Sequence, residues 1–122
     1  MKRVISGVQP SGQIHLGNYL GAIKKFIELQ KDHECIYFIA DLHALTTIRD
    51  PKMMKDLTNE VALAFLALGL DTEKTIFFKQ SDVPEHSECC WIFDAITRMA
   101  FIERAHAWKD AQAKGKKEAT VG

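Results

Sequence analysis

A chain of 122 residues with 47% apolar side chains is long enough for one domain with a modest core. Its 16 basic and 16 acidic residues balance, which excludes a strong overall field directed at nucleic acid or at a membrane surface. Three cysteines, two of them adjacent, make no disulfide framework, and no apolar run has the length of a signal peptide or membrane span. We therefore expect a cytoplasmic protein with no membrane partner.

The first third of the chain predicts a strand, a helix and a second strand. Residues 4–8 form a short β-branched run that Pro10 closes, as at the end of a strand. Residues 17–30 place apolar side chains at helical spacing, with lysines and a glutamate on the opposite face, so they predict an amphipathic helix. Residues 35–40, "CIYFIA", are continuously apolar and predict a strand buried on both faces of a parallel sheet.

The same alternation continues. Asp50 and Pro51 are typical of the start of a helix, and Gly69 of the position just past its end. Residues 75–78, "TIFF", predict a third strand, and a third helix should follow Pro84. Strands that alternate with helices indicate a parallel α/β sheet with right-handed crossovers. The last helix has an apolar stripe formed by Trp91, Ile92, Ala95, Ile96 and Met99.

The glycine-rich stretch of residues 7–22, "GVQPSGQIHLGNYLGA", bridges the end of the first strand and the start of the first helix. Ligands of open α/β sheets bind at that edge, and free N–H groups at a helix start favour phosphate. His15 and Asn18, three residues apart, can donate hydrogen bonds to one group. A turn that serves only tight packing, with His15 as a cap, is the alternative. The dinucleotide pattern GxGxxG and the P-loop pattern are both absent, which disfavours those two sites.

These residues resemble the N-terminal signature of the tryptophanyl-tRNA synthetases, which are class I aminoacyl-tRNA synthetases. "HLGN" at residues 15–18 stands where the class has its HIGH motif. The resemblance continues through "IADLHALT" at 39–46, "QSDVPEHSE" at 80–88 and "IERAHAWK" at 102–109. It implies an α/β fold, the first half of a Rossmann-like (HUP-type) parallel sheet with flanking helices. Residues 1–104 would belong to this half-domain, and residues 105–122 would form a lysine-rich, mobile segment.

The resemblance implies an enzyme that activates tryptophan with ATP, releases pyrophosphate and then charges tRNA(Trp). His15, Asn18 and Lys109 would be catalytic, although Ala111 stands where the family often has a second basic residue in the Lys109 loop. Magnesium would accompany ATP as substrate, and no other cofactor is implied. The implied ATP-binding residues are Gln9, Ser11, Gly12, His15, Gly17 and Asn18.

Ile5, Gln9, Asp41 and His43 would border the amino-acid pocket, but Asp41 after a strand can equally cap the next turn. Residues 80–91 lie in the region through which the family forms its homodimer, so a homodimer is expected. A zinc site is disfavoured because His33, Cys35, His86, Cys89 and Cys90 match no zinc spacing. No metal-ligating residue is therefore assigned.

Two other functions remain open from the residues. A different nucleotidyltransferase of the HxGH group would bind ATP without responding to tryptophan. A non-catalytic fragment would act only in binding or dimerisation. The KMSKS loop, the second half of the sheet and the anticodon-binding domain of the family are absent from these 122 residues, so the activity of the isolated chain is an open question.

Overall fold

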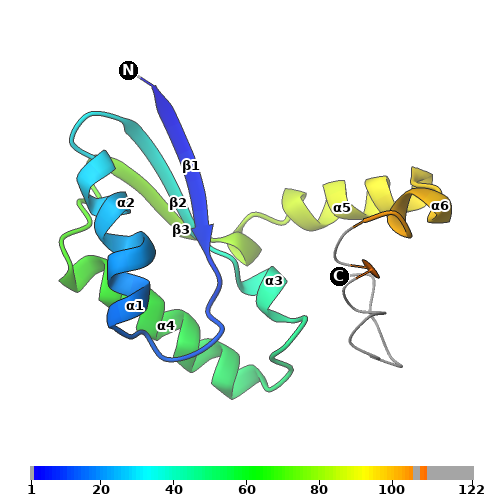
Figure 1. Ribbon diagram of the computed structural model, residues 1–122, viewed down its shortest axis with the longest axis horizontal. Coiled ribbons are helices and arrows are strands. Elements are labelled where there is room, and N and C mark those ends of the chain that lie inside the picture. Colours follow the sequence, from blue (N-terminus) through cyan, green and yellow to red (C-terminus); the bar gives the residue numbers. More distant parts are fainter. Residues whose placement is uncertain (1, 106–107, 110–122) are drawn as a thin grey trace. The chain divides into compact units, whose positions relative to one another are not determined.

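The structure, a computed structural model, describes residues 2–105 and 108–109 of the chain (Figure 1). The chain divides into two compact units, Met1–Asp82 and Val83–Gly122, which are described separately. Most of the expected lysine-rich segment of residues 105–122 lies outside the described residues.

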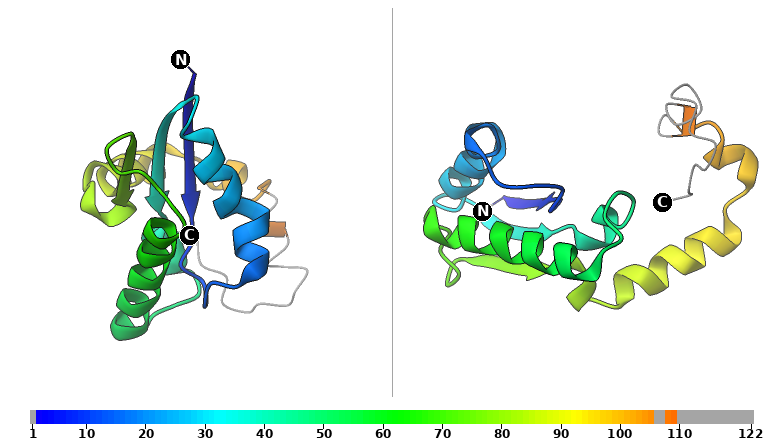
Figure 2. Two further views of the ribbon diagram at one scale, coloured as in Figure 1. Left: turned by 90° about the vertical axis from the view of Figure 1, so that its left-hand side faces the viewer. Right: turned by 90° about the horizontal axis from the view of Figure 1, so that it is seen from below.

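Three parallel strands form the sheet of the first unit, in the order β1 (Arg3–Val8), β2 (Glu34–Ile39) and β3 (Thr75–Lys79). Ile5 pairs with Ile36, and Ile36 with Ile76, so one row of isoleucines crosses all three strands. Figure 1 shows the strands side by side, and Figure 2 gives two further views. The prediction of a parallel α/β sheet, the first half of a Rossmann-like fold, is confirmed.

Helical segments connect the strands. Between β1 and β2 the chain forms α1 (Leu16–Asn18), the π-helical segment η1 (Tyr19–Ile23) and α2 (Lys24–Leu29). Between β2 and β3 it forms α3 (Asp41–Ala44) and α4 (Pro51–Ala67), and the 3₁₀ turn η2 (Gln80–Asp82) follows β3. The predicted ends of α4 are confirmed, because the Asp50 carboxylate accepts from the Met53 N–H and Gly69 has a positive φ of 103°.

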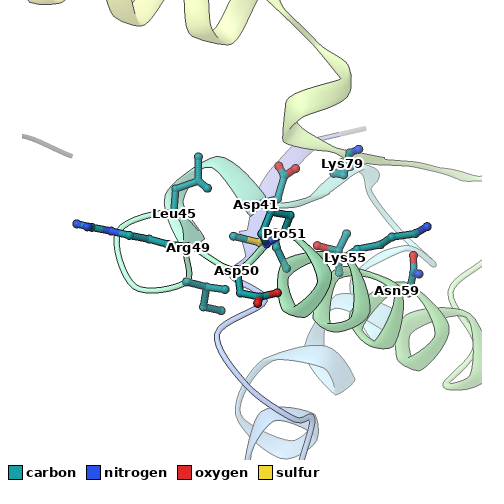
Figure 3. A pocket seen from close by; sticks show the side chains of 11 residues that line it. Asp41, Leu45, Arg49, Asp50, Pro51, Lys55, Asn59 and Lys79 are labelled. Atoms are coloured by element: carbon teal, nitrogen blue, oxygen red, sulfur yellow. The ribbon is translucent and has the colours of Figure 1, made fainter.

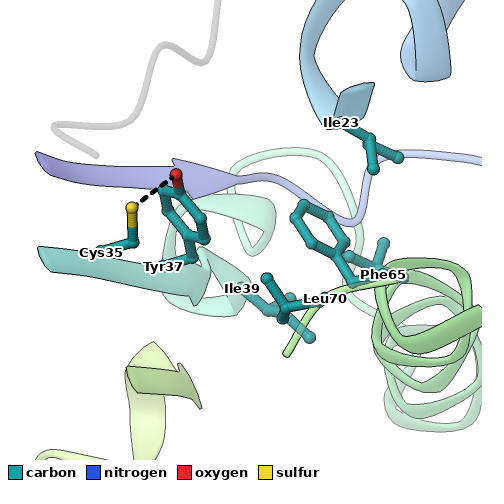
Figure 4. Packing of buried hydrophobic residues seen from close by; sticks show 7 residues of the cluster. Ile23, Cys35, Tyr37, Ile39, Phe65 and Leu70 are labelled. Carbon is teal, nitrogen blue, oxygen red and sulfur yellow. Dashed lines mark hydrogen bonds between the residues drawn. The ribbon is translucent and has the colours of Figure 1, made fainter. Parts of the chain in front are cut away.

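The core lies between α2, α4 and one face of the sheet (Figure 4). Four aromatic rings form its centre in a continuous row. The Phe26 ring stacks on Tyr37 at 4.8 Å between centroids, lies 6.1 Å from Phe65, and Phe65 stacks on Phe77 at 5.2 Å. Such aromatic pairs add to the free energy gained from burial, so this row joins both helices to β2 and β3.

Tyr37 is the buried polar group of this row. Its hydroxyl donates to the Phe26 carbonyl and lies 3.2 Å from the Cys35 sulfur. Figure 4 draws the contact between Tyr37 and Cys35 as a dashed line. Burial raises the pKa of the Tyr37 phenol, and the hydrogen bond to Cys35 acts in the same direction. The phenol is therefore a structural donor that fixes α2 over β2.

Burial differs from the prediction in β2, where side chains are fully buried on one face only. Cys35, Tyr37 and Ile39 are buried against the helices, whereas Ile36 and Phe38 on the opposite face are half-buried. Ile5 and Ile76 on that opposite face are 67% and 57% exposed. The continuous apolar run of β2 predicted burial on both faces, but the helices of this unit pack on only one of them.

The second unit contains α5 (Glu85–Ile96) and α6 (Met99–Ile102). The apolar stripe predicted for one long helix is interrupted, because Thr97 has extended backbone angles and Met99 begins a new helix. No residue of α5 is buried, and Trp91 is 74% exposed. In this unit the stripe is therefore exposed and is not part of a core.

Gln30 joins α2 to the loop before β3 with both ends of its amide, and it offers a test of the packing scheme. Its Nε2 donates to the Gly69 carbonyl at 2.8 Å, and its Oε1 accepts from the Asp71 N–H at 2.8 Å. Gln30→Met keeps the length but removes both bonds, so we expect a loss of about 1–3 kcal/mol in the free energy of unfolding, measured by urea denaturation. Gln13→Met, at an exposed position, is the matched control. Equal stability of the two variants would show that the hydrogen bonds of Gln30 do not stabilise the fold.

Candidate functional site

The carboxyl ends of the three strands meet at one edge of the sheet. The Ala40 N–H donates to the Val8 carbonyl at 2.9 Å, so the residues just after β1 and β2 are neighbours. Asp41 then joins β2 to the residues after β3, because its Oδ1 accepts from the Ser81 N–H at 3.0 Å and from the Leu42 N–H at 3.1 Å. Ligands of open parallel sheets bind at this edge.

The turn after β1 places His15 and Asn18 in a reciprocal cap at the start of α1. The His15 N–H donates to Asn18 Oδ1 at 3.0 Å, and the Gly17 N–H donates to His15 Nδ1 at 3.1 Å. Each of the two side chains thus accepts a hydrogen bond from a backbone N–H of this first turn, as in a capping box. The expected proximity of His15 and Asn18 is present, and it has a structural role of its own.

This cap orients the remaining polar atoms outward. Because His15 Nδ1 accepts a hydrogen bond, the neutral ring carries its proton on Nε2. Because Asn18 Oδ1 accepts, its Nδ2 group keeps both hydrogens to donate. Both residues are exposed, so the start of α1 offers two fixed donors to an anion.

The glycines of the stretch serve close approach rather than unusual backbone angles. Among the described residues the one glycine with positive φ is Gly69, outside the stretch. A Cβ at Gly7 would lie 2.5 Å from the Phe38 ring, and a Cβ at Gly17 would lie 2.9 Å from His15 Cε1. Gly12 and Gly21 have open space instead. Gly17 therefore leaves room for the His15 ring.

The other residues assigned to ATP lie on the loop between β1 and α1. Gln9 is half-buried, and its carbonyl accepts from the Ser11 N–H at 2.9 Å. Pro10 is fully buried and anchors this loop, while Ser11 and Gly12 are exposed. The loop is thus anchored at Pro10, while Ser11 and Gly12 remain accessible to a ligand.

The residues assigned to the amino-acid pocket are less closely grouped. Ile5 points to the open face of the sheet, opposite the helices. Asp41 is only 9% exposed and is held by backbone donors, whereas His43, two residues later on α3, is exposed. Lys109 belongs to the second unit, where its N–H donates to the Ala105 carbonyl.

A cavity of about 510 Å³ opens beside Asp41 (Figure 3). Its walls are α3, the following loop, the first turns of α4 and Lys79 at the end of β3. In Figure 3 the Arg49 side chain points away from the cavity. Three cationic side chains, Arg49, Lys55 and Lys79, line the cavity together with apolar residues, and Lys79 pairs with Asp82 at 3.1 Å.

Sequence reasoning missed Glu60 on α4. Its Oε1 accepts from the Ile14 N–H at 2.9 Å, across 46 residues of chain. Glu60 lies three residues after buried Leu57 and next to buried Val61. A carboxylate on the core-facing side of a helix requires a hydrogen-bond partner, so the position of Glu60 beside buried Leu57 and Val61 was the sequence signal that could have identified it.

Among the described residues no cluster of three or more histidine, cysteine, aspartate or glutamate side chains could hold a metal ion.

The space around Gly17 gives a test of the cap. Gly21→Ala, in the same helical stretch, meets nothing and should raise the free energy of unfolding by about 0.5–1 kcal/mol, measured by urea denaturation. Gly17→Ala should lose that gain because its Cβ displaces the His15 ring from the Gly17 N–H. The His15 ring resonances in NMR should move in this variant alone. Equal stabilisation by both alanines, with an unmoved ring, would contradict the cap.

Comparison with known proteins is consistent with this geometry. A family model described as "tRNA synthetases class I (W and Y)" matches residues 1–122. A tryptophan–tRNA ligase of Rhodopirellula baltica is 52% identical over 113 residues, which are 93% of this chain and 35% of that protein. None of the helices among the described residues combines the length and apolar character needed to cross a membrane.

Solved structures show the same fold. A crystal structure of tryptophanyl-tRNA synthetase from Campylobacter jejuni superposes with a TM-score of 0.88 at 44% identity, covering 97% of this chain and 37% of that one. A second structure of that enzyme, complexed with ADP and tryptophan, gives a TM-score of 0.86. This chain spans about a third of the length of the relatives it matches. Because the family model matches its full length and a relative is 52% identical over 93% of it, the chain belongs to the class I tRNA synthetases of the tryptophan and tyrosine group.

Proposed function

We propose that this chain is the N-terminal part of the catalytic domain of a tryptophan–tRNA ligase. The observation that carries the proposal is the reciprocal cap of His15 and Asn18, which fixes two outward donors at the ligand edge of a parallel sheet. The relatives named tryptophan–tRNA ligase support the choice of amino acid. Such a ligase joins tryptophan to ATP, releases pyrophosphate and then charges tRNA(Trp).

ATP is the proposed ligand of the turn. The tryptophan carboxylate attacks the α-phosphorus, and the bond from that phosphorus to pyrophosphate breaks. His15 Nε2–H and the Asn18 amide would donate to phosphate oxygens as negative charge builds on them. Gln9, Ser11 and Gly12 would line the nucleotide along the loop, and Gly17 would leave room beside it. The bound ADP of the Campylobacter jejuni enzyme supports a nucleotide site in this family.

Magnesium fits this turn only as a companion of ATP. Residues 9–18 contain no carboxylate, so they hold none of the oxygen ligands that this ion prefers in proteins. The phosphates themselves would carry the ion.

Tryptophan would bind on the side of the strand ends that Ile5, Gln9, Asp41 and His43 border. Asp41 would act indirectly, because its Oδ1 is engaged by the Leu42 and Ser81 N–H groups. Its contribution would be to hold the residues after β3 against those after β2. His43, which is exposed, is the freer of the two side chains.

Lys109, a residue of the second unit, would be the third catalytic residue of the complete ligase. In this proposal residues 1–104 make the first half of the catalytic domain, and residues 105–122 are a lysine-rich segment that carries Lys109. The complete ligase would bind tRNA(Trp) and function in the cytoplasm, which the free thiols of Cys35, Cys89 and Cys90 favour.

A homodimer through α5 completes the proposal. Trp91, Ile92, Phe93 and Ile96 are each more than half exposed on this helix, and none of its residues is buried. Exposed apolar patches of this kind mark protein interfaces. A second copy of the same helix is the partner that the family resemblance favours.

The catalytic role can be separated from the cap by substituting Asn18. Asn18→Asp keeps an oxygen for the His15 N–H but removes the amide donor and adds charge beside phosphate. In a complete ligase carrying these residues, we expect tryptophan-dependent pyrophosphate exchange to fall roughly 100-fold, with the melting temperature unchanged. His15→Ala should lower the rate similarly. Near wild-type exchange by the Asn18→Asp variant would refute the role of the amide.

The dimer has its own test. Trp91→Glu should shift the chain to monomer in analytical ultracentrifugation, because the interface would have to bury the new charge. Leu63→Glu places the same charge on an exposed leucine of α4 and should leave the assembly unchanged. A Trp91→Glu variant that stays dimeric would exclude α5 from the interface.

A further inference from the structure

Glu60 connects the middle of α4 to the turn that carries the proposed nucleotide site. Its Oε1 accepts from the Ile14 N–H at 2.9 Å, and both residues are half-buried. The Ile14 side chain packs against the core cluster that includes Val61, the next residue on the helix. The hydrogen bond therefore fixes the backbone of Ile14, and the packing fixes its side chain. Figure 1 shows the turn beside α4.

The hydrogen bond between Glu60 and the Ile14 N–H matters because it lies next to the cap of His15 and Asn18. Ile14 immediately precedes His15, whose own N–H donates to Asn18 Oδ1 at 3.0 Å. Two successive backbone donors are thus fixed, one by α4 and one by the cap. The bond to Glu60 sets where the turn lies on the domain, and the cap then sets how the His15 and Asn18 side chains point.

The charge of Glu60 argues against a role in binding the nucleotide directly. A carboxylate near phosphate is repulsive, and here one of its oxygens is turned to a backbone donor instead. A charged acceptor makes a stronger hydrogen bond than a neutral one, which suits a half-buried contact. A glutamate that was exposed here and made no hydrogen bond to Ile14 would only repel an anion and would not hold the turn in place.

We propose that Glu60 is a positioning residue, which holds the Ile14 backbone so that the donors of His15 and Asn18 meet the nucleotide phosphates. The inference rests on the proposed function for the identity of the ligand. The hydrogen bond between Glu60 and the Ile14 N–H is independent of the proposed function, because it forms without nucleotide. Glu60 touches neither substrate nor reacting atoms in this account.

Three substitutions separate geometry from charge. Glu60→Gln keeps an acceptor oxygen for Ile14 and removes the charge. Glu60→Met keeps the length and removes the acceptor, with Glu60→Ala as the replacement if the methionine variant does not fold. Asp56→Asn removes one charge from an exposed site one turn earlier on the same helix and is the matched control.

The first readout needs no ligand. Amide hydrogen exchange in the 122-residue chain should become roughly tenfold faster at Ile14 in Glu60→Met, because the N–H loses its acceptor. Glu60→Gln and Asp56→Asn should keep the wild-type exchange rate at Ile14. Unchanged exchange at Ile14 in both Glu60→Met and Glu60→Ala would overturn the proposal.

The second readout is magnesium–ATP affinity of the same variants, followed by NMR titration. Glu60→Met should raise the dissociation constant roughly tenfold, whereas Glu60→Gln should bind as tightly as wild type or more tightly, since repulsion is removed. Equal ATP affinity of the Glu60→Met and wild-type chains would also overturn the proposal. If the wild-type chain binds no ATP, the proposed nucleotide site fails for this chain, and exchange at Ile14 still decides whether Glu60 fixes the turn.

Discussion

The site depends on two hydrogen bonds at the first turn of a helix, in which Asn18 Oδ1 accepts from the His15 N–H and His15 Nδ1 accepts from the Gly17 N–H. This arrangement uses one polar atom of each side chain and leaves the other as an outward donor. A helix start already offers unsatisfied N–H groups and a partial positive charge. The cap therefore turns a general property of helix ends into two donors with fixed directions.

The sheet and α4 supply the surroundings that make this cap useful. The aromatic row from Tyr37 through Phe26 and Phe65 to Phe77 fixes α2 and α4 on one face of the sheet. Asp41 joins the residues after β2 to those after β3, and Glu60 holds the turn after β1 from the side of α4. Each strand end at the ligand edge is thus held by a hydrogen bond from elsewhere in the fold.

The sequence predicted the elements well because their signals are local. Asp50, Pro51 and Gly69 mark the ends of α4 by capping chemistry, and β-branched and aromatic runs mark the strands. Long-range features could not be read in this way. The bond from Ile14 to Glu60 depends on how two segments 46 residues apart pack, and the burial of β2 on one face depends on where the helices lie. The exposure of Trp91 could not be predicted for the same reason, since helical spacing shows a stripe but not what covers it.

We propose that the glycine-rich turn is a preformed phosphate site in this segment of the chain. The most direct measurement is a two-dimensional amide NMR spectrum of the 122 residues, recorded with and without magnesium–ATP. The account predicts dispersed resonances, with shifts concentrated between Gln9 and Asn18 and small changes elsewhere in the first unit. A folded spectrum that does not respond to millimolar magnesium–ATP would contradict the claim.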